Sequence, residues 1–119
     1  DTYRGCAIAI ADIESEDLRI IASQAADEML NISGIQSSYV LYRTGDIVNI
    51  SARSMGAMNV QLIMEMLGGG GHQTMAAAQL SNISVSDAKV RLLQVIDQFY
   101  AQINAQEEAP QERPEEMQN

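Results

Sequence analysis

Residues 67–78 read LGGGGHQTMAAA and place four consecutive glycines directly before the only histidine of the chain. A helix is predicted before the glycines, because apolar residues recur there at positions i, i+3, i+4 and i+7: Val60, Ile63, Met64 and Leu67. Gly68 stands where a glycine commonly closes a helix. The run AAAQL at 76–80 is best interpreted as a strand after a short turn. The stretch therefore predicts a helix, a glycine turn and a strand.

The residues just before this stretch predict a hairpin. Two β-rich runs, SYVLYR at 38–43 and DIVNISARS at 46–54, flank Thr44 and Gly45. Such runs around a short glycine-containing turn are typical of antiparallel strands. Asn59 follows them and is suited to cap the helix that leads into the glycines.

Further toward the N-terminus, an apolar run at 4–12 predicts a buried strand. Ser15 is predicted to cap the next helix, with Glu16 and Asp17 in its first turn, where acidic side chains suit the helix dipole. Residues 31–34 are predicted to end it. Apolar residues at helical spacing predict its buried stripe: Leu18, Ile21, Ala22, Ala25, Met29 and Leu30.

The C-terminal part is expected to contain one helix and a tail. Ser86 is predicted to cap the helix, and Gln106 begins a stretch rich in Gln, Glu and Pro that predicts disorder. The candidate core contacts of the helix are Val90, Leu93, Ile96, Phe99, Tyr100 and Ile103. We therefore expect one domain at 1–105 and a disordered acidic tail at 106–119. Alternating helices and strands with one hairpin predict an α/β fold, a small mixed β-sheet backed by helices.

Composition limits the function. The chain has 119 residues, enough for one core, and is 46% hydrophobic but only 4% aromatic. Cys6 lies in an apolar run, which predicts a buried reduced thiol. No apolar run reaches the roughly 20 residues of a membrane span. Because the chain begins at Asp1 close to a predicted strand, we expect it to be a piece of a longer protein or a processed product.

The formal net charge is −9, and residues 106–119 contribute five glutamates against one arginine. Proteins that follow long DNA or RNA gain affinity from basic patches, so an acidic chain is poorly suited to them. A small anionic ligand held by a few local donors stays possible.

The glycine run does not fit the common phosphate-binding motifs. A Walker loop requires a Lys after its glycines, and a dinucleotide-binding fingerprint requires a strand before them. Two interpretations stay open: Gly69, Gly70 and Gly71 form a flexible surface loop, or their N–H groups form a concave anion site. In the second, His72 would donate a ring N–H to a phosphate.

A second candidate cluster lies upstream. Arg53 and Ser54 end a predicted strand, and ligands of α/β folds often bind at strand ends. Arginine offers a planar set of donors to phosphate or stacks on a base. The simpler alternatives are a solvated arginine and, for Asn59, a role only as a helix cap.

The series ISARSMGAMNVQLIMEMLGGGGH at 50–72, followed by AAAQL, resembles the DHH-associated domain at the C-terminal end of DHH-family phosphoesterases. Its R-S, N-V and G-G-G-G-H elements are close to the version in bacterial cyclic-di-AMP phosphodiesterases. IASQAADEML resembles the first helix of that group, and SYVLYR its hairpin strand. The likeness covers residues 3–103.

This resemblance implies that the chain is one part of a two-part bacterial signalling hydrolase. In such enzymes a DHH domain of the same chain holds two manganese ions, which activate water to hydrolyse a phosphodiester. The associated domain grips the substrate, here expected to be cyclic-di-AMP or linear pApA. The substrate-binding residues implied by the matching motifs are Arg53, Ser54, Asn59, Gly69, Gly70, Gly71 and His72.

The chain departs from the complete enzymes in one respect. It has no Asp-His-His run and a single histidine, so it cannot assemble their two-metal site. We therefore expect no catalytic residue and no metal ligand here, and an isolated chain that binds without hydrolysing. The resemblance also implies a cytoplasmic domain of a membrane-anchored parent protein.

Other functions remain to be separated. One is the substrate-binding half of a DHH-family oligoribonuclease or nucleoside bisphosphate phosphatase. Another is a non-catalytic nucleic-acid-binding module like that of alanyl-tRNA synthetase, which the acidic charge disfavours. The least favoured is a homodimer formed through exposed methionines, for which the candidates are Met55, Met58, Met64, Met66 and Met75.

Overall fold

The computed structural model describes residues 1–12 and 17–112. Its strands form one six-stranded sheet in the order β1-β2-β3-β4-β6-β5. The strands are β1 (Thr2–Tyr3), β2 (Cys6–Ala11), β3 (Ser37–Thr44), β4 (Ile47–Ser54), β5 (Gly70–Gly71) and β6 (Met75–Ser81). The helices are α1 (Leu18–Met29), α2 (Val60–Glu65) and α3 (Val85–Glu112). Only β2 and β3 pair in parallel, and the predicted mixed α/β fold is confirmed.

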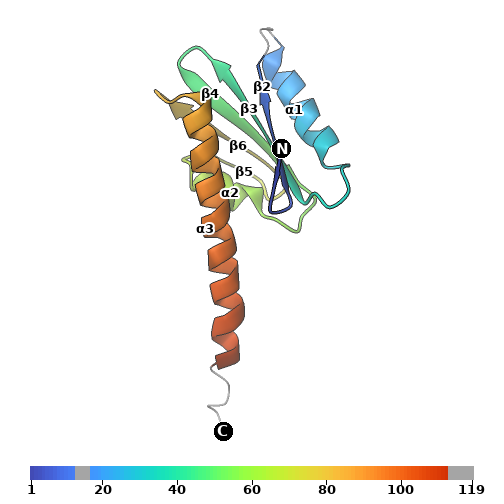
Figure 1. Ribbon diagram of the computed structural model, residues 1–119, viewed down its shortest axis with the longest axis vertical. Coiled ribbons are helices and arrows are strands. Elements are labelled where there is room, and N and C mark those ends of the chain that lie inside the picture. Colours follow the sequence, from blue (N-terminus) through green and yellow to red (C-terminus); the bar gives the residue numbers. More distant parts are fainter. Residues whose placement is uncertain (13–16, 113–119) are drawn as a thin grey trace.

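The helices lie on both faces of the sheet. In Figure 1, α1 lies on one face and α2 with α3 on the other. Parallel neighbours require a crossover connection, and α1 supplies it between β2 and β3. The C-terminal half of α3 extends away from the body (Figure 1).

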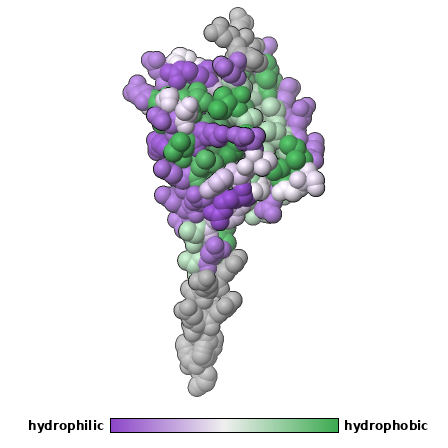
Figure 2. Space-filling view, in the orientation of Figure 1, coloured by the Kyte–Doolittle hydropathy of each residue, from purple (hydrophilic) through white to green (hydrophobic). Residues whose placement is uncertain are grey.

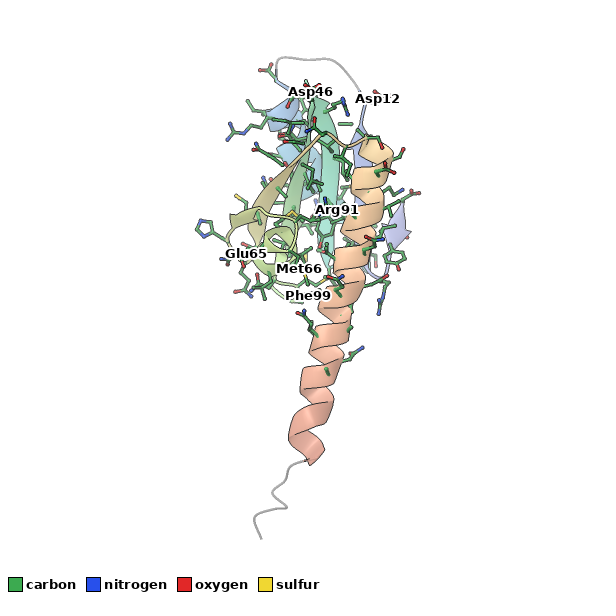
Figure 3. All side chains as sticks on the ribbon, turned by 90° about the vertical axis from the view of Figure 1, so that its left-hand side faces the viewer. Asp12, Asp46, Glu65, Met66, Arg91 and Phe99 are labelled. Carbon is green, nitrogen blue, oxygen red and sulfur yellow. The ribbon has the colours of Figure 1, made fainter. Side chains whose placement is uncertain are left out.

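The main core lies between the sheet and the helices α2 and α3. Tyr39, Leu41 and Ile50 of the sheet are fully buried there against Ile63 of α2. Figure 3 shows Met66 at the end of α2 and Phe99 of α3 in this region. A smaller core under α1 contains Leu18, Ala22, Ala26, Val40 and Tyr42. In Figure 2 the hydrophobic surface residues are interrupted by hydrophilic ones and form no continuous apolar area on that side.

The structure confirms the hairpin and the cap of α2. β3 and β4 pair from Ser37↔Ser54 to Thr44↔Ile47, so the turn is Gly45–Asp46, one residue later than predicted. Asn59 Oδ1 accepts hydrogen bonds from two N–H groups of the first turn of α2, at 3.0 and 3.3 Å.

The N-terminal strand differs from the sequence prediction. Arg4 and Gly5, expected within the strand, instead form a two-residue turn between β1 and β2, and both have positive φ. This conformation suits the twist of a tight hairpin. The helix after β2 begins at Leu18 with Asp17 at its N-cap position. The expected cap, Ser15, lies outside the described residues.

The last helix begins two residues earlier than predicted. Ser84, rather than Ser86, is its cap, because the Ser84 hydroxyl accepts the Asp87 N–H at 3.0 Å. Val90, expected in the core, is 51% exposed, since α3 turns it away from the sheet. The backbone stays helical to Glu112, past the expected boundary at Gln106, which is compatible with the high helix propensity of Ala, Gln and Glu.

Candidate functional site

One sheet face is only partly covered. α1 packs mainly on β3, and a groove of about 640 Å³ lies beside it over β4, β6 and β5. Arg19 and Ser23 of α1 line the wall, and strand residues line the rest. This volume lies in the range of small-molecule sites in proteins.

The sheet register arranges the groove residues, together with His72 beside the groove, in three rows that cross the strands. Directly opposite residues of antiparallel strands place their side chains on the same face. The arginine row is Arg53, Met75 and His72; the middle row is Ser51, Ala77 and Gly70; the amide row is Asn49 and Gln79. The intervening residues Ala76, Ala78 and Leu80 of β6 point into the main core and are buried.

Arg53 is fixed at one side of the groove. Its residue is only 9% exposed. The Nε group donates to Asp27 Oδ1 of α1 at 3.0 Å, and Nη1 donates to the Ala52 carbonyl oxygen at 2.9 Å. A guanidinium carries five N–H bonds, so three are left for a ligand. Because both bonds set its orientation, the Arg53 guanidinium is preorganised to donate hydrogen bonds to an anion.

The groove contrasts in charge with the rest of the chain. Among the described residues, its lining contains two arginines, Arg19 and Arg53, and no Asp or Glu. The whole chain carries a net charge of −9. Asp27 lies next to the groove, and its bond to Arg53 is partly exposed to solvent. A negatively charged ligand is therefore favoured in this groove over the rest of the surface.

Each glycine of the run has its own environment. The Gly68 N–H donates to the Glu65 carbonyl and the Gly69 N–H to that of Met64, with Gly68 at φ +85°, which is a Schellman ending of α2. Gly70 and Gly71 are neither a flexible loop nor a turn but the edge strand β5. The predicted helix-closing role of Gly68 is thereby confirmed. The concave anion site is wrong for Gly69, because a helix carbonyl already accepts its N–H group.

His72 lies at the rim of the site. It is exposed, and its backbone N–H and carbonyl bond to Met75 at 2.7 and 3.3 Å, which continues the β5–β6 hairpin. The register therefore puts His72 two strands from Arg53, at a Cα separation of about 10 Å. It is not among the residues that line the groove.

Ser54 and Asn59 have structural partners. The Ser54 hydroxyl donates to the Gln73 carbonyl at 3.3 Å and accepts the Gly56 N–H at 3.2 Å. It thereby joins the end of β4 to the turn after His72. Asn59 caps α2. Of the seven predicted contact residues, the structure brings Arg53, Gly70 and Gly71 into the groove. Ligand contact by any of the seven stays a prediction.

The sequence reasoning did not single out several groove residues. Arg19 and Ser23 come from α1, Ser51 from β4 and Gln79 from β6. The signal for the strand residues was present, since polar Asn49, Ser51 and Arg53 alternate with Ile50 and Ala52 along β4. For α1 no comparable signal exists, because its position beside β4 depends on tertiary packing.

Within the part of the chain that the structure describes, no three His, Cys, Asp or Glu side chains are grouped so as to hold a metal ion. In residues 1–12 and 17–112, no helix has both the length and the apolar character that a membrane span requires.

Fold and groove together define a small α/β domain with a site suited to an anionic ligand. Comparison with known families matches residues 5–102 to the DHHA1 domain, and the chain belongs to this family. The resemblance noted in the sequence is thereby confirmed at the family level.

Curated relatives give the setting of the domain. The chain is 45% identical over 99 residues to cyclic-di-AMP phosphodiesterase PdeA of Listeria monocytogenes, covering 82% of this chain and 15% of that protein. It is 48% identical over 98 residues to cyclic-di-AMP phosphodiesterase GdpP of Bacillus subtilis, covering 78% and 15%. The chain thus spans about 15% of the length of these relatives.

A solved structure shares the fold at low identity. The C-Ala domain of Aquifex aeolicus alanyl-tRNA synthetase superposes with a TM-score of 0.57 at 17% identity, covering 76% of this chain and 88% of that one. At this identity the likeness concerns the fold alone.

Proposed function

We propose that this domain binds the substrate of a cyclic-di-AMP phosphodiesterase, either cyclic-di-AMP itself or linear pApA. A DHH domain of the same protein would hydrolyse the phosphodiester. Relatives that are 45% and 48% identical bear the name of this enzyme, which supports the proposal. The parent protein would be membrane-anchored with this domain in the cytoplasm. The homodimer through a methionine face is not proposed again, because Met58 and Met64 are buried in the main core.

The observation that carries the proposal is the groove of about 640 Å³, which the described residues line with two arginines and no acidic side chain, in a chain of net charge −9. A dinucleotide combines phosphates with flat, largely uncharged bases. The groove offers matching parts: Arg53 and Arg19 for phosphate, and small or uncharged residues elsewhere.

The residues of this chain would bind and orient the nucleotide. Arg53, held by Asp27 and the Ala52 carbonyl, would donate its remaining N–H groups to a phosphate. Gly70 and Gly71 would let the ligand approach the backbone, since no side chain stands there. Ser54, Asn59, Gly69 and His72 would contribute around this centre, chiefly by shaping the segment that links β4 to β6.

Manganese does not fit the described residues of this domain, which contain no suitable ligand group. In the proposed enzyme the metal would therefore be held by the DHH domain and would supply the activated water. We propose no hydrolytic step through this chain, and we expect the isolated chain to bind without hydrolysing.

Titration of the chain with cyclic-di-AMP and with pApA, followed by amide chemical shifts, tests the proposal. The amides of Arg53, Gly70 and Gly71 are expected to shift. Arg19→Gln should weaken binding about tenfold, the size expected for one lost charge-assisted hydrogen bond. Arg91→Gln is the matched control, because Arg91 is an exposed residue of α3 on the opposite face of the sheet (Figure 3).

Three results would refute the proposal. One is the absence of binding, and another is a set of shifts confined to α3. The third is tighter binding of short RNA or of adenosine 3′,5′-bisphosphate than of either dinucleotide, which would favour the oligoribonuclease or bisphosphate phosphatase alternative.

A further inference from the structure

The fold would tolerate a side chain at Gly70, in contrast to the other positions of the glycine run. A Cβ on Gly69 would lie 2.1 Å from the Ala77 carbonyl oxygen, and one on Gly71 would lie 2.5 Å from Ala76 Cα. Gly68 has φ +85°. Gly70, in contrast, has no positive φ, and a Cβ there would meet nothing within 4 Å.

A glycine without a structural reason is unusual in a strand, because glycine weakens strands and often marks a close approach of another group. Gly70 is opposite Ala77, whose side chain is exposed and lines the groove. A side chain at position 70 would therefore point into the groove. The space that this side chain would fill is then available to the ligand, which gives the glycine a reason.

The middle row forms a shallow channel across the sheet. Its members, Ser51, Ala77 and Gly70, have the smallest side chains of the groove face, and they span two strand spacings, about 10 Å. The flanking rows stand about 7 Å away along the strands on either side. Val40, opposite Ser51 on β3, is buried under α1, so the channel is closed there and open at β5. A flat ring fits such a space.

The charges show which part of the ligand belongs there. The middle row has no charged group and only one hydroxyl, that of Ser51, whereas Arg53 lies in the neighbouring row. A phosphate would therefore bind at the arginine row and a base at the middle row.

The amide row faces the edge of that ring. Gln79 is exposed, and its side-chain amide has no hydrogen-bond partner among the described residues. Asn49 Nδ2 already donates to Thr44 Oγ1 at 2.8 Å, so its amide is fixed. A free carboxamide offers one acceptor and a donor side by side, which complements the N6 donor and N7 acceptor of adenine.

We propose that the middle row is the binding site for a purine base of the bound dinucleotide. Gly70 lacks a side chain so that the ring can enter, and Gln79 makes the site prefer adenine. This inference rests on the proposed function and adds a specificity-determining residue to it.

The experiment measures affinities of the chain for cyclic-di-AMP and cyclic-di-GMP by calorimetry, together with melting temperatures. Gly70→Ala should weaken cyclic-di-AMP binding about tenfold or more, as one misplaced carbon does in a fitted pocket, with no loss of thermal stability. Ala77→Val narrows the same channel from β6 and should act likewise. Its control is Ser81→Val, which enlarges another exposed residue of β6 outside the groove lining.

Gln79→Leu should reduce the preference for cyclic-di-AMP over cyclic-di-GMP about tenfold. One bidentate contact to a base gives discrimination of this size, and the variant loses that contact. Gln94→Leu, on exposed α3, should leave the preference unchanged.

The outcomes separate the two proposals. If the unmodified chain binds cyclic-di-AMP in the groove but Gly70→Ala and Ala77→Val bind it equally well, the proposed base-binding site is refuted and the proposed function stands. An unchanged preference in Gln79→Leu refutes its role in specificity. If the unmodified chain binds neither nucleotide, both proposals fall.

Discussion

Replacing Gly71 by alanine tests whether close packing of β5 on β6 explains the glycines on either side of Gly70. The added Cβ would lie 2.5 Å from Ala76 Cα, 2.6 Å from the Met75 carbonyl oxygen and 2.8 Å from Ala76 Cβ. Ordinary carbon contacts are about 3.5–4.0 Å. All three atoms belong to the backbone or to a Cβ, so no side-chain rotation relieves the overlap.

The strand β5 must therefore move away from β6. This would stretch the bond from the His72 N–H to the Met75 carbonyl, now 2.7 Å, and disturb the contact with α2 behind it. Overpacking of this kind costs about 1–3 kcal/mol. The backbone at Gly71, with φ +144°, adds strain of about 1 kcal/mol or more for a residue with a Cβ.

We thus expect Gly71→Ala to lower the free energy of unfolding by about 2–4 kcal/mol, which corresponds to a fall of about 8–20 °C in melting temperature for a domain of this size. Thermal unfolding followed by circular dichroism measures it, and Gly70→Ala is the matched control with an unobstructed Cβ. If the two variants melt together, within about 3 °C of the unmodified chain, the packing argument is refuted.

Two further predictions concern the cap of α3 and the pH dependence. Ser84→Ala should lower the free energy of unfolding by about 1 kcal/mol, as removal of a helix cap does, whereas Ser86→Ala should hardly change it. Urea unfolding measures both variants. A larger loss for Ser86→Ala than for Ser84→Ala would contradict the assignment of the cap. The Arg4 guanidinium, with the Tyr3 hydroxyl, lowers the pKa of Asp97. Because the pKa is lower in the folded state, the carboxylate contributes stability above its unfolded pKa, near 4, and this contribution is lost as pH falls through the folded value. The melting temperature of Asp97→Asn should therefore lie below that of the unmodified chain at pH 7 and approach it near pH 3, and a constant difference would exclude this role.

Local patterns were sufficient to predict much of the fold. The β-rich runs at 38–43 and 46–54 and the turn at Gly45 predicted the β3–β4 hairpin, which the register confirms. Asn59 and Gly68 were correctly predicted to begin and end α2, because a cap and a helix-closing glycine act on neighbouring backbone groups.

The errors occurred where several residues could serve locally. Ser84 and Ser86 are both acceptable caps by residue type, and in the structure it is the Ser84 hydroxyl that accepts the Asp87 N–H. Val90 fits an apolar helical stripe, but only the direction in which α3 approaches the core determines that Leu92 is buried and Val90 exposed.

For the site, the residues by themselves indicated candidate contact residues: an arginine at a strand end, a glycine run and a histidine in an acidic chain, with the family resemblance that the motifs carry. The tertiary structure decided the arrangement. It paired Gly70 and Gly71 with β6 as an edge strand, set Arg53 against Asp27 of α1, and left the amide of Gln79 facing an open groove. These contacts join segments far apart in the chain, and their geometry depends on how the strands pair and on where α1 packs, which no local pattern encodes.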